Sequence, residues 1–258
     1  MARASRHYIP DCVWHITHRC HKQEFLLRFK KDRLRWLRWL FEAKKRFGLI
    51  ILNYTVTSNH IHLLVLDSSK EVIPKSMQLI AGRSAQEFNQ RKKRKGAFWE
   101  DRYHATAIQT DQHLMRCLVY IDLNMVRAGV VKHPAEWICG GYNEIQNPRD
   151  RYSLINQKVL LDLFEENDSE QFRDNHCQCV EESINIKREP NWTEAVAVGS
   201  KDFIEKTKDR LKADARGRSI ENDDGTYVLK ETQNSYSTVF NTEKDSLSRK
   251  NEYYWDIY

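Results

Sequence analysis

The sequence predicts an α+β protein whose centre is a ferredoxin-like antiparallel sheet. Two observations carry this prediction. The apolar patterns of residues 12–108 follow the order β-α-β-β-α-β, and only three residues separate the second strand from the third, a gap short enough for a hairpin. A further helix follows, and beyond Pro148 the pattern becomes a mainly helical C-terminal extension. We therefore expect one domain over residues 1–148 and the extension over residues 149–258.

Each element is predicted from its own periodicity, with alternation typical of strands and helical spacing of apolar residues typical of helices. The first domain is expected to hold a strand at 12–19, a helix at 31–47, strands at 49–56 and 60–66, a helix at 73–90, a strand at 104–108 and a helix at 111–128. Asp111 is the expected N-cap of that last helix, and Gly129 its stop. In the extension we expect helices at 154–166 and 200–216 and a short strand at 227–229.

Charge is divided unevenly along the chain. Residues 1–150 contain 26 Lys and Arg against 14 Asp and Glu, a net charge of +12, whereas residues 151–258 contain 16 against 22, a net charge of −6. A basic half indicates a polyanionic partner. The acidic half argues against a protein that coats nucleic acid along its whole length.

The six cysteines show no disulfide framework in a chain of this length, 258 residues. Cys177 and Cys179 follow His176 like a fragment of a zinc site, but no second cysteine pair accompanies them, which favours reduced thiols. The chain has no secretory apolar segment at its start and no run of about 20 apolar residues. We expect a cytoplasmic protein that does not enter a membrane.

Two histidines stand out inside the apolar run 50–66. His60 and His62 are separated by one residue, and because side chains alternate along a strand, both point to the same face of the sheet. Neutral histidine is the commonest metal ligand. Packed, hydrogen-bonded histidines are the alternative, since a buried imidazole needs a partner. From the pair alone, both interpretations stay open.

The predicted helix at 111–128 carries a second pair of polar side chains. Tyr120 and Asn124 are four residues apart, so they lie one turn from each other on the same helix face. Taken alone, this spacing fits an amphipathic helix with a tyrosine that reaches solvent and a solvated asparagine. The combination with the histidine strand is what favours a functional site.

That combination resembles the single-tyrosine HUH transposases, and most closely their REP-associated tyrosine transposase group. The resemblance covers roughly residues 5–145 and rests on segments in the family's order. These segments are Tyr8-Ile9-Pro10, Trp14-His15-Ile16-Thr17, His60-Ile61-His62, Phe88-Asn89, Gly96-Ala97-Phe98-Trp99-Glu100-Asp101-Arg102-Tyr103 and the run from Tyr120 to Gly129. The chain departs from the family at Met125, where proline is frequent, and at Thr57-Ser58, where Met-Pro is frequent.

The resemblance implies a transposase that nicks and rejoins single-stranded DNA at hairpin-forming palindromes. Tyr120 would be the nucleophile of a 5′-phosphotyrosine intermediate. His60, His62 and Asn124 would hold a divalent ion, Mg²⁺ or Mn²⁺. No GxxxxGK[ST] segment is present, in keeping with a reaction that needs no nucleotide hydrolysis. Two alternatives remain open: a non-catalytic DNA-binding regulator on the same scaffold, and an RNA-stem binder, which rests on the basic and aromatic residues alone.

The expected DNA-binding residues are basic side chains of the first domain. They are Arg33, Arg35 and Arg38 on the first helix, the run Arg91, Lys92, Lys93, Arg94 and Lys95, and the separate Arg102 and Arg127. Each neutralised phosphate releases counterions, which favours such contacts. We expect the run 91–95 to be a loop that contacts phosphates, although a solvated loop has the same composition. Phe98, Trp99 and Tyr103 follow it and could stack on bases or pack in the core. The protein would act as a monomer or a homodimer.

Overall fold

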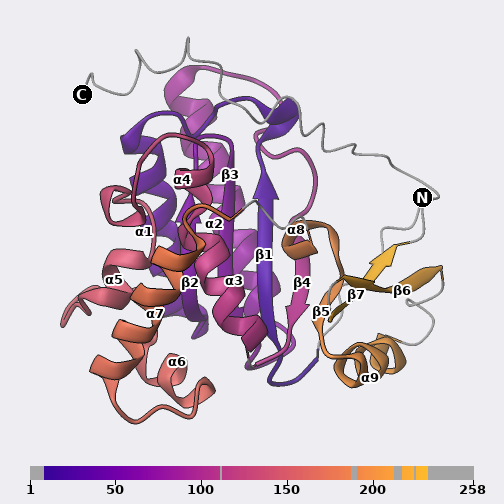
Figure 1. Ribbon diagram of the computed structural model, residues 1–258. Helices are drawn as coiled ribbons and strands as arrows, with labels where there is room; N and C mark the ends of the chain where they lie inside the picture. The colour runs from indigo at the N-terminus through magenta and orange to yellow at the C-terminus, as the bar shows by residue number, and fades with distance from the viewer. Residues whose placement is uncertain (1–8, 111, 187–190, 212–216, 224, 232–258) are drawn as a thin grey trace.

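The computed structural model describes residues 9–231 except 111, 187–190, 212–216 and 224. Its centre is a seven-stranded sheet with the strand order β2-β3-β1-β4-β5-β7-β6 (Figure 1). The first four strands form the predicted ferredoxin-like unit. They are β1 (Val13–Arg19), β2 (Ile50–Val56), β3 (His60–Leu66) and β4 (His104–Ile108), all antiparallel to their neighbours within the unit.

Helices cover both faces of this unit. Helix α1 (Lys30–Phe47) packs on α2 (Val72–Lys92), and α3 (Gln112–Asp122) lies across the sheet from them (Figure 1). The register of the strands shows which side chains lie on which face of the sheet, because residues paired across neighbouring strands share a face. Thr17 pairs with His62 on the α3 side. The next residue, His18, points the other way and stacks on Trp99, whose indole donates to the α2 carbonyl of Ala81.

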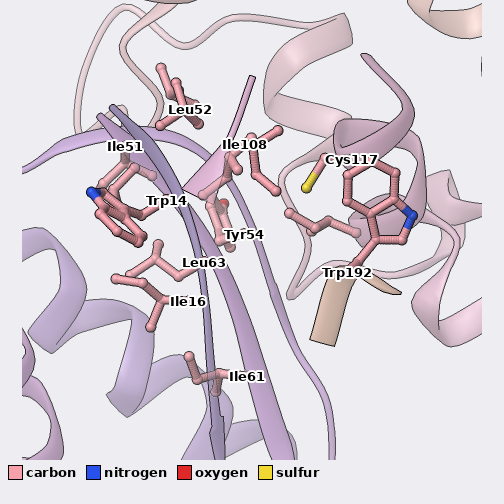
Figure 2. Close-up of a cluster of buried hydrophobic side chains, with 14 of the residues drawn as sticks. Trp14, Ile16, Ile51, Leu52, Tyr54, Ile61, Leu63, Ile108, Cys117 and Trp192 are labelled. Carbon is pink, nitrogen blue, oxygen red and sulfur yellow. The ribbon is translucent and has the colours of Figure 1, made fainter. Parts of the chain in front are cut away.

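Apolar side chains fill both layers of the core. In Figure 2, Trp14, Ile16 and Leu63 gather on one side of the strands, whereas Cys117 of α3 and Trp192 lie on the other. These five side chains are all buried. The strands therefore read as nearly continuous apolar runs, because both faces of the sheet are covered.

The predicted helix at 111–128 is wrong in one respect, because it is two helices. Helix α3 ends at Asp122, and α4 (Asn124–Arg127) begins after Leu123, whose ψ of 1° leaves the helical range. Helical hydrogen bonds continue across the break, from the Leu123 N–H to the Val119 carbonyl. Gly129 ends α4 with a φ of 69°, as predicted. The expected N-cap, Asp111, lies outside the described residues.

The other helices and strands of the first domain begin and end close to the predicted residues, and β3 and β4 have the predicted bounds. The break after Asp122 explains why Met125 can replace the frequent proline. Residue 125 lies in the first turn of α4, where proline is tolerated but not needed.

The extension is helical as expected, and the short strand expected at 227–229 lies within a longer strand, but two further strands were not predicted. Its helices are α6 (Gln157–Leu163), α7 (Ser169–Ser183), α8 (Asn191–Glu194) and α9 (Lys201–Leu211), preceded by the short η2 (Pro134–Glu136) and α5 (Tyr142–Gln146). Strands β5 (Ala197–Gly199), β6 (Arg218–Asp223) and β7 (Thr226–Glu231) continue the sheet beyond β4. A three-residue strand such as β5 is too short to show alternation.

The chain after α4 covers both edges of the ferredoxin-like unit. On one side, β5 pairs in parallel with β4. On the other, the edge of β2 receives three backbone bonds: the Val56 N–H donates to Cys139, and the Gly141 and Asn156 N–H groups donate to β2 carbonyls. Both edge strands of the unit therefore have backbone partners along part of their length. Within the described residues, no helix is long and apolar enough to span a membrane.

A buried polar pair locks the extension to α3. His176 of α7 donates from Nε2 to the Asp122 carboxylate at 2.8 Å, and neither side chain is more than 1% exposed. Asn53 of β2 donates to the other carboxylate oxygen at 3.0 Å, and Gln146 donates to His176 Nδ1 at 2.9 Å. The carboxylate depends on these donors, because a buried charge without partners is costly.

Substitution of His176 by leucine is expected to lower the free energy of unfolding by about 3–5 kcal/mol, because the Asp122 carboxylate then stays buried without its main donor. Urea titration of the full chain measures this loss. As a control, Asn175→Leu changes an exposed neighbour on α7 and should cost less than about 0.5 kcal/mol. The double variant His176→Leu with Asp122→Leu should lose less than the two single losses combined. Equal losses for His176→Leu and Asn175→Leu would contradict the buried pair.

Candidate active site

The first and third residues of β3 present two imidazoles to the α3 side of the sheet. The ring centroids of His60 and His62 are 4.9 Å apart, and their planes are nearly perpendicular. His62 is buried and His60 is half-buried. The strand alternation thus places the pair as the sequence predicted, on one face and close together.

Asn124 lies between these two rings. Its amide nitrogen donates to His62 Nε2 at 2.9 Å, and its amide oxygen is 3.3 Å from His60 Nε2. As the first residue of α4, Asn124 is carried by a different helical segment from the one that carries Tyr120. The break after Asp122 therefore separates two groups that the sequence pattern had placed on one helix, yet both still reach the histidines.

Tyr120 completes the cluster from α3. Its ring lies 5.7 Å from the His62 ring and edge-on to it, and the Arg127 guanidinium lies 5.6 Å from the tyrosine ring centroid. The Trp192 ring of α8 is 6.4 Å away. Only 2% of Tyr120 is exposed. The four residues singled out in the sequence are brought together, and the tyrosine is enclosed.

One residue of the cluster was missed as a site residue by sequence reasoning. His15 of β1 lies on the same face, its Nε2 is 2.9 Å from His62 Nδ1, and its Nδ1 is 2.8 Å from the Trp192 carbonyl oxygen. Burial lowers the pKa of His15 to about 4, so the ring is neutral at pH 7. The signal was present in the alternation of β1, where a histidine interrupts an apolar strand, but its partners are 47 and 177 residues away in sequence.

The donor set fits a hard divalent cation. Asn59 and Thr57 contact His60 Nδ1, and His15 contacts His62 Nδ1, so that in each ring Nε2 faces the Asn124 amide. An amide placed between two ring nitrogens offers N–H to one of them and oxygen to the other, whichever way it is turned. Oxygen facing a nitrogen lone pair is favourable when a cation lies between them.

The third donor of this set is an amide, which makes the set a weak one. Among the residues that the structure describes, no group of three or more His, Cys, Asp or Glu side chains could hold a metal ion. His60, His62 and the Asn124 oxygen instead supply two nitrogens and one neutral oxygen. This combination suits Mg²⁺ or Mn²⁺ better than zinc, which favours thiolates and closed four-ligand sites.

The arginines predicted on α1 differ in their surroundings. Arg33 is buried, donates to the carbonyls of Leu27 and Arg28, and lies over the Trp137 ring at 4.7 Å. It supports the loop before α1 and lies inside the protein instead of on its surface. Arg35 and Arg38 are exposed, but α1 lies across the sheet from the His60 cluster.

The basic run 91–95 was expected to be a loop, and its first two residues instead extend α2. Lys93 ends the helix with a φ of 50°. Arg91 is ion-paired with the buried carboxylate of Asp32. Arg94 donates to the Ala97 carbonyl at 2.8 Å. The exposed members of the run are therefore the lysines Lys92, Lys93 and Lys95.

The aromatic residues after this run are mostly structural. Phe98 is buried, and Trp99 is half-buried with its indole bonded to α2. Tyr103 is half-buried, and Arg102 is exposed.

An aromatic residue that the sequence analysis did not single out is more open. Phe29 is 49% exposed and lies 5.2 to 5.8 Å from three cations, those of Arg28, Lys31 and Lys92. The loop that carries it is bonded to the hairpin before His60, from the Leu27 N–H to the Ser58 carbonyl.

Comparison with known proteins gives one family match and two similar solved structures. Residues 8–124 match the family model described as IS200-like transposase. Among solved structures, the chain is similar to a REP-associated tyrosine transposase bound to a REP hairpin, with 18% identity over 56% of this chain and 84% of that chain and a TM-score of 0.44. It is also similar to a candidate transposase from Deinococcus radiodurans R1, with 18% identity, coverage of 40% and 84%, and a TM-score of 0.32. No curated protein matches the chain.

Proposed function

We propose that this chain, whose residues 8–124 match the IS200-like transposase family model, nicks and rejoins single-stranded DNA with Tyr120 as the nucleophile. The observation that carries the proposal is the convergence of Tyr120 with His60, His62 and Asn124. Helix α3 begins 46 residues after strand β3 ends, yet the rings of His62 and Tyr120 are 5.7 Å apart. The arrangement has the parts that a phosphoryl transfer by a tyrosine needs.

In the proposed step, the Tyr120 hydroxyl oxygen attacks the scissile phosphorus while the bond from phosphorus to the 3′ oxygen breaks. The tyrosine loses its proton, the leaving 3′ oxygen gains one, and the 5′ phosphate stays on the protein. Rejoining is the reverse attack by a 3′-hydroxyl. The phosphodiester energy is kept in the phosphotyrosine, so that no nucleotide hydrolysis is required.

Tyr120 needs help at neutral pH, because the reference pKa of a tyrosine is about 10. The Arg127 guanidinium lies over the tyrosine ring, 5.6 Å from its centroid. His60, His62 and Asn124 would hold the metal. A divalent ion bound there would polarise a non-bridging phosphate oxygen and neutralise developing charge.

The DNA path that fits best runs along the end of the sheet where β3 begins. Lys92, Lys93 and Lys95 supply exposed charge there, and Phe29 supplies an exposed ring for an unpaired base. The loop of Phe29 is bonded to the hairpin that leads into His60. Arg35 and Arg38 lie across the sheet and would contact only DNA that extends round this end, such as the stem of a hairpin.

One observation favours the alternative of a DNA-binding regulator without catalysis. Tyr120 is 2% exposed, and a side chain so enclosed cannot meet a phosphate. In the catalytic proposal, the side chains that enclose the tyrosine must move when DNA binds. In the alternative they stay in place, DNA binding is insensitive to chelators, and no covalent product forms.

The decisive experiment is covalent trapping. We expect the full chain, incubated with Mn²⁺ and single-stranded DNA carrying the palindromes that flank its gene, to form a protein–DNA adduct that survives denaturing electrophoresis. Tyr120→Phe should form none at any metal concentration, whereas the matched variant Tyr103→Phe should still form it. An adduct with Tyr120→Phe, or none with the wild type on any of these substrates, would contradict the proposal.

The metal ligands are expected to differ in importance. His60→Ala or His62→Ala should abolish cleavage while keeping most of the DNA affinity, because the lysine contacts are untouched. Asn124→Ala should raise the Mn²⁺ concentration for half-maximal cleavage by about tenfold, or about 1.4 kcal/mol, and keep residual activity at saturation, because it removes a neutral ligand. Metal titrations of the cleavage rate measure both effects. Unchanged metal dependence in Asn124→Ala would place the third ligand elsewhere.

The exposed lysines are expected to set the salt dependence of DNA binding. Replacing Lys92, Lys93 and Lys95 with glutamine should reduce the slope of log affinity against log salt by about 2, at about 0.7 for each lost single-strand contact. Fluorescence anisotropy at several salt concentrations gives this slope. The control replaces Lys201, Lys206 and Lys208 of α9, which removes the same charge at the far side of the sheet (Figure 1). Equal slopes for the two triple variants would make the 92–95 segment a solvated surface.

A further inference from the structure

A buried chain of hydrogen bonds joins the extension to one of the proposed metal ligands. The Trp192 carbonyl oxygen of α8 is 2.8 Å from His15 Nδ1, His15 Nε2 is 2.9 Å from His62 Nδ1, and His62 Nε2 faces Asn124. His15 and Trp192 are at most 1% exposed, and so is His62. The His15 and His62 rings are stacked, with centroids 5.1 Å apart and planes within 13° of each other.

The chemistry of these groups determines which atom donates in each hydrogen bond. A carbonyl oxygen only accepts, so His15 Nδ1 must carry the proton. His15 is fully buried, which disfavours a doubly protonated, charged ring, so its Nε2 has a lone pair and accepts a hydrogen bond from His62 Nδ1–H. The lone pair of His62 is therefore on Nε2, the nitrogen that faces the Asn124 amide. Only this tautomer of His62 can bind a cation at that position.

The two ligand histidines obtain this tautomer from different parts of the chain. His60 Nδ1 is 2.7 Å from the Asn59 amide oxygen, which also only accepts, so His60 is set by its own hairpin. His62 receives its Nδ1 contact from His15, at 2.9 Å. His15 in turn depends on a carbonyl 177 residues away.

The Trp192 carbonyl is held firmly enough to act as this anchor. The Thr106 hydroxyl, from the β4 residue paired with His15, is 3.3 Å from the same oxygen and donates to the Ala195 carbonyl at 2.6 Å. The Ala107 N–H on β4 donates to the Val196 carbonyl just before β5. Strand pairing between β4 and β5 thus fixes α8 against β1 (Figure 1).

We propose that His15 is a positioning residue of the metal centre, and that the Trp192 carbonyl acts through it to hold His62 in the tautomer that presents Nε2 to a divalent ion. The inference deepens the proposed function and rests on its metal site. It assigns a role to the extension: α8 completes the support of a site whose ligands all lie in the first domain.

The direct test is the tautomer of His62 in the full chain, without metal and without DNA. Long-range ¹H–¹⁵N correlation spectra of protein labelled at histidine distinguish a ring protonated at Nδ1 from one protonated at Nε2, and His62→Gln identifies the signals. We expect Nδ1–H for both His62 and His15. A His62 ring protonated at Nε2 would overturn the inference.

Two variants of His15 provide the matched comparison. Glutamine can replace the relay, because its amide N–H donates to the Trp192 carbonyl while its oxygen accepts from His62, whereas phenylalanine keeps a ring but neither polar atom. We expect His15→Phe to weaken Mn²⁺ binding by tenfold to a hundredfold. His15→Gln should remain within about threefold of the wild type. Calorimetry or electron paramagnetic resonance of free Mn²⁺ gives the affinities without DNA.

Equal Mn²⁺ affinities for the wild type and His15→Phe would also overturn the inference. If His15→Phe fails to fold, the wild-type spectra and His15→Gln still decide the question. Failure here is separable from failure of the proposed function. A wild-type chain that forms the Tyr120 adduct but shows the wrong tautomer refutes only this inference, and one that shows the right tautomers and Mn²⁺ affinities but no adduct refutes only the cleavage proposal.

Discussion

The site depends on how α3 is held against the sheet. Two polar side chains of β2 donate to carbonyls near the end of α3: Asn53 to Leu118 at 3.3 Å, and Thr55 to Ile121 at 3.0 Å. Both side chains are buried and share the face of His62, because Thr55 pairs with His62 in register. Carbonyls near a helix end need partners, and here the sheet supplies them. The contact brings Tyr120 to the histidines, and the break that follows at Leu123 then places Asn124.

Local sequence patterns predicted the helices and strands that carry the site. The register of β3 then determines that the two histidines face Tyr120 and Asn124. Alternation put His60 and His62 on one face, helical spacing put Tyr120 near Asn124, and the order of strands and helices defined the sheet that brings them together. The functional roles of these residues remain predictions, but their positions agree with the geometry that those roles require. A residue slip in β3 would have turned both histidines to the α1 and α2 side.

What the sequence did not reveal depends on contacts between distant residues. The role of His15 follows from partners 47 and 177 positions away. Arg33 resembled its exposed neighbours on α1 in composition, but the fold places Trp137 over it and turns it inward. Arg91 is one of five consecutive cations. Only the fold shows that this arginine forms an ion pair with Asp32. A run of charged residues indicates a basic surface, but it does not show which of those side chains form contacts within the protein.

The acidic extension acquires a physical meaning from its placement. Its described residues cover both edges of the ferredoxin-like unit, lock α3 through His176, and support His62 through α8. The site is thereby divided into two parts. His60 and His62 are fixed in the sheet with their Nδ1 atoms occupied, whereas Asn124 and Tyr120 are carried by helices that meet at Leu123. Because the break separates Tyr120 from Asn124, a small movement of α4 would shift Asn124 more than Tyr120, and the histidines in the sheet would then define where a bound cation lies.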